Sequence, residues 1–311
     1  MSLPTSDDVE RAAATIRGVV RATPLLDGSA LGAGILIKAE LLQHAGSFKA
    51  RGVTNRLAAL TPDERGRGVI GVSAGNHAMA LAWGSAREGL DCLLVMFRGA
   101  SPYKLARTRE FGATVEVVDG DPRAAFDRMG EIVAESGRVV IHPFDDPLVV
   151  AGQGTVGLEI VEAVSGLDTI VVPTGGGGLV SGIAAAVAST GVEIVAVEPE
   201  LSAALGEALA AGGPVPVTPV TRAGGLDAPY AGTLAYALCK EHAVRAVTVT
   251  DDAIEAAMRR VYADLKLACE PAAAAGIAAV LADPGAYGRT AVVVSGGNVA
   301  AETASAILAS P

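Results

Sequence analysis

One lysine of this chain lies in a context that could make its amine reactive. Lys49 follows an apolar run at 35–40 that predicts a strand, and the spacing of residues 50–60 predicts a helix with Ser47 as its N-cap. In the first helical turn, the helix dipole and the loss of water both lower the pKa of a lysine amine. A neutral amine can form a Schiff base with a carbonyl compound. The alternative is an ordinary surface lysine at a helix start.

A glycine run could supply a partner for such an amine. It follows a predicted strand at 169–172 and opens a predicted helix at 178–189. Consecutive glycines are costly in conformational entropy, but they let backbone N–H groups converge on an anion at a helix N-terminus. The run therefore predicts a phosphate site rather than a tight turn. Its residues are Gly175, Gly176, Gly177, Gly178 and Leu179.

The glycine run also allows a nucleotide-binding oxidoreductase as a runner-up. Glu198 lies about 20 residues further on, near the end of the next strand, where a ribose-binding acid would stand. The run does not match the Gly-x-Gly-x-x-Gly order, because Ser181 takes the place of the last glycine. This alternative also gives Lys49 no role.

Two further polar loops follow predicted strands. The loop at 73–77 joins a strand at 69–72 to a helix at 76–87, and its small residues suit a carboxylate bound by backbone N–H groups and the Ser73 hydroxyl. His77 in this loop could act as a base, although a histidine at a helix start is more often structural. The second loop, Ser295-Gly296-Gly297-Asn298, ends a strand at 291–294.

These loops need a scaffold of alternating strands and helices. Apolar runs at 92–96, 114–118, 139–141, 193–197 and 247–249 predict further strands, and helical spacing lies between them. Such alternation predicts an α/β fold of two open, twisted, mostly parallel sheets flanked by helices. We predict a large cofactor-binding domain at 1–67 and 146–311. A small substrate-loop domain at 68–145 would face it across the cofactor cleft.

Composition excludes several classes of protein. The 311 residues carry a net charge of −10 and are 50% hydrophobic, which favours a large core and argues against nucleic acid as a partner. No apolar run reaches the roughly 18–20 residues of a membrane span, and the N-terminus does not resemble a signal peptide. The three cysteines are far apart in apolar surroundings, so we expect core residues, a reducing compartment and a cytoplasmic protein.

Together, segments 47–52, 73–77, 175–178 and 295–298 resemble, in order, those of the threonine/serine dehydratase and serine racemase family. These are pyridoxal-phosphate enzymes of the tryptophan-synthase-β fold group, fold type II, and the resemblance covers nearly the whole chain. It implies pyridoxal 5'-phosphate on Lys49, a small amino acid substrate and a homodimer. It implies cofactor contacts from the glycine run and from Phe48, Asn76, Glu270, Ser295 and Gly296. It implies substrate contacts from Ser73, Ala74, Gly75, Asn76 and His77.

The resemblance also implies a reaction. A serine beside the pyridine nitrogen, as Ser295 would be, makes the ring a weaker electron sink and favours loss of a β-substituent. We therefore expect a dehydratase (ammonia-lyase) that converts L-threonine or L-serine to a 2-oxo acid and ammonia, with Lys49 removing the α-proton. An amino acid racemase is the alternative, but Ala74 stands where racemases of this family have a proton-donating serine. A cofactor-binding protein without turnover is a third reading.

The chain departs from the family pattern at two places. Some relatives bind a cation through a Glu-Pro segment and an acid six residues later, whereas here Glu198 is followed by Ala204, so we expect no metal there. The family's Ala-Asp-Gly turn reads Ala223-Gly224-Gly225, which leaves the natural substrate open.

Overall fold

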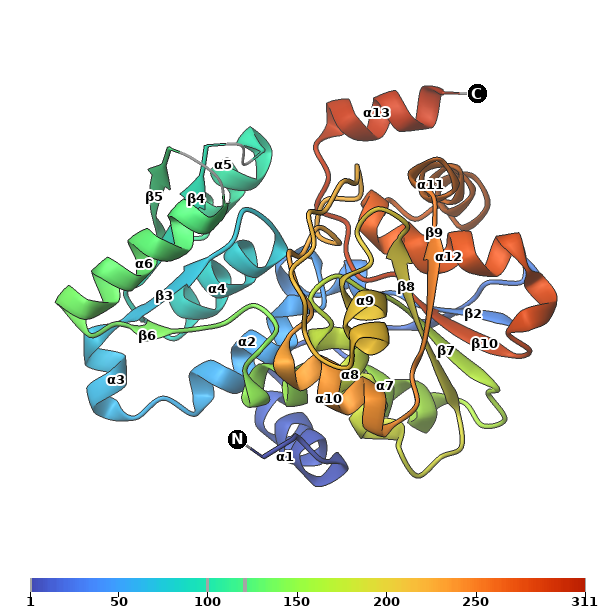
Figure 1. Ribbon diagram of the computed structural model, residues 1–311, viewed down its shortest axis with the longest axis horizontal. Helices are drawn as coiled ribbons and strands as arrows, with labels where there is room; N and C mark the ends of the chain where they lie inside the picture. The colour runs from blue at the N-terminus through green and yellow to red at the C-terminus, as the bar shows by residue number, and fades with distance from the viewer. Residues whose placement is uncertain (1, 99–100, 120–121, 311) are drawn as a thin grey trace.

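The computed structural model describes residues 2–98, 101–119 and 122–310 and contains two separate sheets, one on each side of Figure 1. In the larger sheet the strands follow the order β1-β2-β10-β7-β8-β9, and in the smaller one β5-β4-β3-β6. Every neighbouring pair is parallel except β1 and β2. The predicted α/β fold with two mostly parallel sheets is therefore confirmed.

The strand bounds follow the apolar runs closely. The larger sheet is built from β1 (Leu25–Asp27), β2 (Ile35–Lys38), β7 (Thr169–Pro173), β8 (Glu193–Pro199), β9 (Arg245–Val249) and β10 (Thr290–Val293). The smaller sheet is built from β3 (Val69–Val72), β4 (Cys92–Phe97), β5 (Thr114–Val118) and β6 (Val139–Val140). All strands of the smaller sheet thus fall inside the predicted small domain, whose boundaries stay a prediction.

Helices cover both faces of the larger sheet. Val171 of β7 packs in a core with α11 (Asp251–Leu265) and α12 (Pro271–Ala282), whereas its neighbours Ile170 and Val172 pack with α7 (Pro147–Ala163) and α8 (Gly178–Val187). This alternation is the period of two that a strand imposes. Each of these side chains is fully buried, and its burial contributes about 1.5–3 kcal/mol to the free energy of folding.

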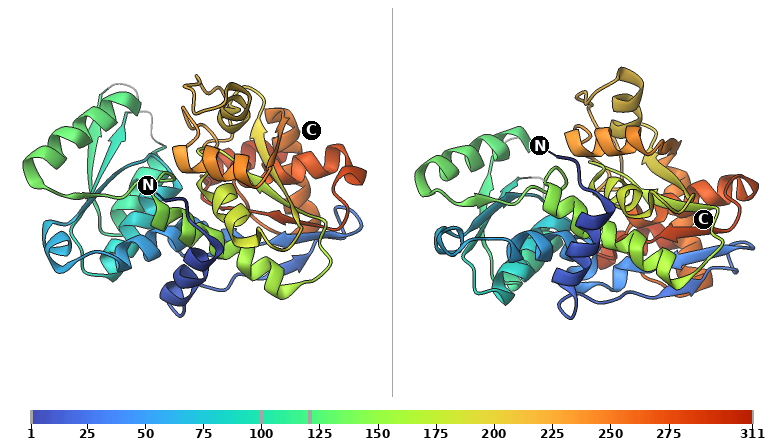
Figure 2. Two further views of the ribbon diagram at one scale, coloured as in Figure 1. Left: turned by 60° about the horizontal axis from the view of Figure 1, so that its bottom comes forward. Right: turned by 90° about the horizontal axis from the view of Figure 1, so that it is seen from below.

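The smaller sheet is covered in the same way. Leu94 of β4 packs with α2 (Lys49–Ala58) and α4 (Asn76–Arg87), and its neighbour Val95 packs with α6 (Pro122–Ser136) on the opposite face. Helix α2 contacts both α4 and α7, so it lies where the two halves of the molecule meet. Figure 2 shows the N-terminus near this junction and α6 on the outside of the smaller sheet.

The remaining helices are peripheral. They are α1 (Ser6–Ile16), α3 (Pro62–Arg67), α5 (Pro102–Glu110), α9 (Ala204–Ala211), α10 (Thr233–Glu241) and α13 (Ala301–Ala309), with short 3-10 turns at Glu40–Leu42, His44–Gly46 and Pro284–Ala286. Among the described residues, no helix is long and apolar enough to cross a membrane.

The structure corrects several predicted elements. The helix expected at 154–164 already begins at Pro147, because the Asp146 carboxylate accepts from the N–H groups of Leu148 and Val149 and caps it. The strand expected at 35–40 ends at Lys38. Helices α3 and α10 and strand β1 were not predicted, since they are short and their tertiary contacts are distant in sequence.

Candidate active site

Lys49 is the first residue of α2, in the half-buried junction between the two sheets. Its amine donates a hydrogen bond to the Pro143 carbonyl at 2.7 Å and lies 5.0 Å from the centre of the Phe48 ring. Burial lowers the pKa of this amine to about 8. With this pKa about a tenth of the amine is neutral at pH 7, and the neutral form is the one that acts as a nucleophile.

The start of α2 is not capped as the sequence predicted. Ser47 has extended backbone angles and its buried Oγ has no partner, while Phe48 occupies the N-cap position without a side-chain hydrogen bond. The prediction of a Ser47 cap was wrong, because Ser47 instead forms a β-bridge with Gly296. Something other than a cap must hold the first turn of α2.

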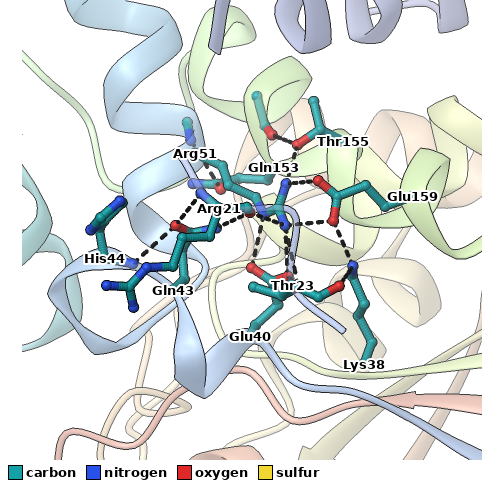
Figure 3. A network of polar contacts seen from close by, with 12 residues as sticks. Arg21, Thr23, Lys38, Glu40, Gln43, His44, Arg51, Gln153, Thr155 and Glu159 are labelled. Carbon is teal, nitrogen blue, oxygen red and sulfur yellow. Dashed lines mark hydrogen bonds and ion pairs between the residues drawn. The ribbon is translucent and has the colours of Figure 1, made fainter. Parts of the chain in front are cut away.

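The far side of that turn is held by buried charges, drawn in Figure 3. Arg51 is fully buried and binds both oxygens of Glu40 at 2.8 Å and both oxygens of Glu159, on α7, at 2.6 and 2.8 Å. The Lys38 amine completes the cluster with bonds to Glu159 at 2.5 Å and to the Thr23 carbonyl. Arg51 stands two residues after Lys49, about 200° around the helix, so it anchors the face opposite the reactive amine.

Backbone contact with α7 reinforces this anchor. Gly52 donates its N–H to the Gln153 side chain, and a Cβ on Gly152 would lie 2.6 Å from the Gly52 Cα. The two helices therefore touch along their glycines, which fixes the start of α2 against α7. Two glycines are required here because any side chain would force the helices apart.

The glycine run forms the predicted turn between β7 and the start of α8. Among the described residues, the backbone N–H groups of residues 175–179 have no hydrogen-bond acceptor. All but Gly176 of these residues are buried. Buried unpaired N–H groups are costly, and at a helix N-terminus they constitute an anion site. The side chain of Leu179 packs into the core, so only its backbone is available to a ligand.

Phe144 connects the lysine to the glycine run. Its neighbour Pro143 accepts from Lys49, while a Cβ on Gly176 would lie 2.5 Å from the Phe144 ring and one on Gly178 would lie 3.0 Å from its backbone. The run is thus glycine partly because this segment packs against it. Asp145 then caps α10 through the N–H groups of Thr233 and Leu234, which fixes the segment in place.

The loop after β10 contacts the two residues that precede Lys49. The Ser295 carbonyl accepts from the Phe48 N–H at 3.1 Å. Gly296 leaves no room for a Cβ, because the carboxylate of Glu270 packs directly against it.

Glu270 in turn accepts a hydrogen bond from the Asn76 amide at 2.5 Å, and the Asn76 oxygen accepts one from Asn298. Burial raises the pKa of Glu270, partly offset by nearby Lys104.

The loop at 73–77 opens α4 from the smaller sheet. Its Ser73 hydroxyl accepts from the Gly75 N–H at 3.1 Å, and α4 has no side-chain cap. Among the described residues, the N–H groups of Ala74, Asn76 and His77 have no acceptor, so this second helix start can also receive an anion. Through Asn76 and Glu270 it is joined to the loop after β10.

His77 is the predicted site residue with the least access. It is 2% exposed, and its Nε2 lies 2.8 Å from the Ile141 carbonyl. Burial lowers the pKa of His77 to about 3, so the imidazole is neutral and a poor base. The geometry favours a structural role in the wall of the site.

These residues fit the expected cofactor. An amine, a set of unpaired N–H groups for a phosphate, a second set for a carboxylate and a serine at the end of β10 all meet around α2. Lys49 could hold the aldehyde of pyridoxal 5'-phosphate, residues 175–179 its phosphate, and Asn76 and Ser295 the polar atoms of its ring. Phe48, Glu270 and Gly296 would line the same site.

Glu198 has a different task from the ones considered for it. It is fully buried, and its two oxygens accept from the N–H groups of Leu205 and Gly206 in the first turn of α9, at 2.7 and 2.8 Å. Burial raises its pKa to about 7. The carboxylate therefore caps α9, and the absence of a metal at this place stays a prediction.

Three residues of the site could not be predicted from the sequence. Pro143 and Phe144 stand in a loop whose contacts with Lys49 and the glycine run are long-range. Lys104, beside Glu270, reads as a surface lysine in a helix start. The segment 142–147, with two prolines, separates two runs of alternating strands and helices, and this position could have indicated Pro143 and Phe144. No sequence feature indicated Lys104.

Comparisons with known proteins agree with this geometry. Residues 16–296 match the family model of the pyridoxal-phosphate dependent enzymes. The chain is 38% identical to a phenylserine dehydratase from Ralstonia pickettii, covering 90% of this chain and 88% of that protein. It is 37% identical to an L-threonine ammonia-lyase from Thermotoga maritima, covering 95% and 76%. The structure of maize serine racemase superposes with a TM-score of 0.92 at 33% identity, covering 97% and 96%.

These similarities span nearly the whole chain, and the similar proteins are a dehydratase, an ammonia-lyase and a racemase. They fix the fold as type II of the pyridoxal-phosphate enzymes and the cofactor as pyridoxal 5'-phosphate, and they rule out the oxidoreductase alternative. The chain belongs to the family of pyridoxal-phosphate dependent enzymes.

Proposed function

We propose that this protein is a dehydratase (ammonia-lyase) that converts a β-hydroxy amino acid, L-threonine or L-serine in the first place, to a 2-oxo acid and ammonia. The observation that carries the proposal is the meeting of the Lys49 amine with two sets of unpaired N–H groups, at residues 175–179 and 73–77. One set suits the cofactor phosphate and the other the substrate carboxylate. The phenylserine dehydratase and the L-threonine ammonia-lyase among the relatives support the reaction class.

Each residue has a stated task in this proposal. When bound, pyridoxal 5'-phosphate supplies an aldehyde for the substrate amine and an electron sink for the bonds at Cα. Lys49 holds the cofactor at rest and, once released, takes the proton from Cα, which its pKa of about 8 permits near neutral pH. The loop 73–77 holds the carboxylate, and hydroxide leaves from Cβ. Water then completes the conversion to 2-oxo acid and ammonia.

The choice of elimination over racemisation rests on Ala74. Racemisation needs a proton delivered to the face of Cα opposite the lysine, from a group within about 3 Å or one water. Ala74 has no proton to give, and we assign the neighbouring Ser73 hydroxyl, which accepts from the Gly75 N–H, to the substrate carboxylate rather than to Cα. His77 is buried and bonded to the Ile141 carbonyl, so it is not available as that acid.

A panel of amino acids tests the proposal. L-serine, L-threonine and phenylserine are incubated with the enzyme, and 2-oxo acid, ammonia and the D-enantiomer are each measured. We expect 2-oxo acid and ammonia in equal amounts and little D-enantiomer. Ala74→Ser should raise racemisation about tenfold or more, since a positioned acid contributes 10²–10⁴-fold; Ala74→Val controls for added bulk. Fast racemisation by the unaltered enzyme would contradict the proposed dehydratase and favour a racemase.

We propose a homodimer in the cytoplasm, with domains at 1–67 with 146–311 and at 68–145. The buried free thiols Cys92, Cys239 and Cys269 support a reducing compartment. Light scattering should give a mass of twice 31.1 kDa.

A further inference from the structure

Lys104 brings a positive charge to the edge of the site from the smaller sheet. It lies in the first turn of α5, with a side chain that is only 16% exposed. Its amine is 3.6 Å from the Glu270 carboxylate, which belongs to the other half of the molecule. A Cβ on Gly75 would lie 3.9 Å from the same amine. Lys104 therefore adjoins the loop 73–77 as well as Glu270.

The pairing with Glu270 is incomplete. A distance of 3.6 Å exceeds that of a good hydrogen bond, whereas Arg107 and Glu110 on the surface of the same helix meet at 2.5 Å. The other Glu270 oxygen is engaged by the Asn76 amide. The Lys104 ammonium thus retains donors that no described residue uses.

The other lysines are committed elsewhere. Lys49 donates to the Pro143 carbonyl, and Lys38 belongs to the buried cluster around Arg51. Lys240 and Lys266 are exposed and bond within their own helices or turns. Of the five lysines, all within the described residues, Lys104 is therefore the one that adjoins the loop 73–77 and keeps unused donors.

We infer that Lys104 binds the carboxylate of the amino acid substrate together with the loop 73–77, and that this carboxylate replaces Glu270 as its counter-ion. The inference rests on the proposed function for the place of the carboxylate. Backbone N–H groups at a helix start supply only partial charge, whereas an ammonium group adds a charge-assisted hydrogen bond. Lys104 would make the site select amino acids over amines and amides of the same size.

A simpler role would be a bridge between the two halves of the molecule. In that case Lys104 would act by holding the two halves of the molecule in place. Its loss would then weaken the binding of every ligand that reacts with the cofactor to a similar extent. The two roles differ in one property: only direct binding distinguishes a ligand with a carboxylate from one without.

L-alanine and L-alaninamide provide that distinction. Both carry the same amine and skeleton, but the amide has no negative charge, and neither has a leaving group at Cβ. Their binding to the holoenzyme is followed by the change in its visible absorbance. Lys104→Met should bind L-alanine about 10- to 100-fold more weakly, the effect of one hydrogen bond to a charged group. Binding of L-alaninamide should change less than about twofold.

Controls keep the test decisive. Arg107→Met removes the same charge from the exposed side of α5 and should leave both affinities unchanged. Lys104→Arg should recover part of the L-alanine affinity, and Lys104→Gln replaces Lys104→Met if the latter does not fold. Equal weakening of both ligands, or no weakening of L-alanine, overturns the inference. Because L-alanine cannot be dehydrated, failure to form 2-oxo acid from serine would count against the proposed reaction alone.

Discussion

Lys49 combines the position and the environment that its chemistry requires. It begins a helix, its amine is held by one backbone carbonyl, and burial rather than a charged neighbour lowers its pKa to about 8. The sign of the shift is the one expected for a cation deprived of water. The neutral fraction of the amine should therefore fall about tenfold for each pH unit below 8.

This gives a prediction for the apo-protein. Labelling with an amine-acylating reagent, followed by mass spectrometry, should show a midpoint near pH 8 for Lys49. In protein unfolded by urea the midpoint of the same residue should return to about 10.5, because the desolvation is lost. A folded-state midpoint equal to the unfolded one would mean that the amine is solvated and that the site does not activate it.

At the scale of the element, α2 is positioned from its far side. Its first turn lacks a cap, and the buried cluster of Arg51, Glu40, Glu159 and Lys38 takes over that task. Two cations balance two anions, so the cluster is neutral overall. A buried ion pair is weak evidence of net stability, but losing one partner leaves buried charge uncompensated. Arg51 is accordingly a positioning residue for Lys49.

Arg51→Met should lower the free energy of unfolding by about 3–5 kcal/mol, because Glu40 would keep only the Thr23 hydroxyl as a partner. Arg51→Lys should cost less, since it keeps the charge but loses the two-pronged geometry. Urea unfolding measures both. Arg245→Met is the matched control: it breaks the exposed pair with Glu193 and should cost no more than about 1 kcal/mol. Equal effects of Arg51→Met and the control would refute the anchoring role.

At the scale of the whole molecule, two sheets bring together loops that are far apart in sequence. The apolar runs predicted β3 and β5 with their observed bounds, because buried parallel strands contain little else. The glycine run and Lys49 were also recognisable, since their residue types are unusual at a helix start. Sequence could not reveal the Arg51 cluster, the Phe144 contact or Lys104, because each depends on packing between distant segments. The prediction of Ser47 as the N-cap of α2 was wrong for the same reason, because its β-bridge with Gly296 overrides the local capping preference.

The distribution of possible metal ligands over the described chain gives a prediction about metals. No group of three or more His, Cys, Asp or Glu side chains in the described residues could hold an ion. Glu198 already caps α9, and Ala204 cannot act as a ligand. Prolonged treatment with a chelator should therefore leave turnover and melting temperature unchanged. Activity that disappears on chelation and returns with magnesium would show that a cation site forms elsewhere.

Reductive labelling shows directly whether Lys49 carries the cofactor. The holoenzyme is reduced with borohydride, digested, and mapped by mass spectrometry for the pyridoxyl group. We expect the label on Lys49, which Pro143 and Phe144 connect to the unpaired N–H groups of residues 175–179. A label on Lys38, Lys104, Lys240 or Lys266 would contradict it, and the site built around α2 would have to be abandoned.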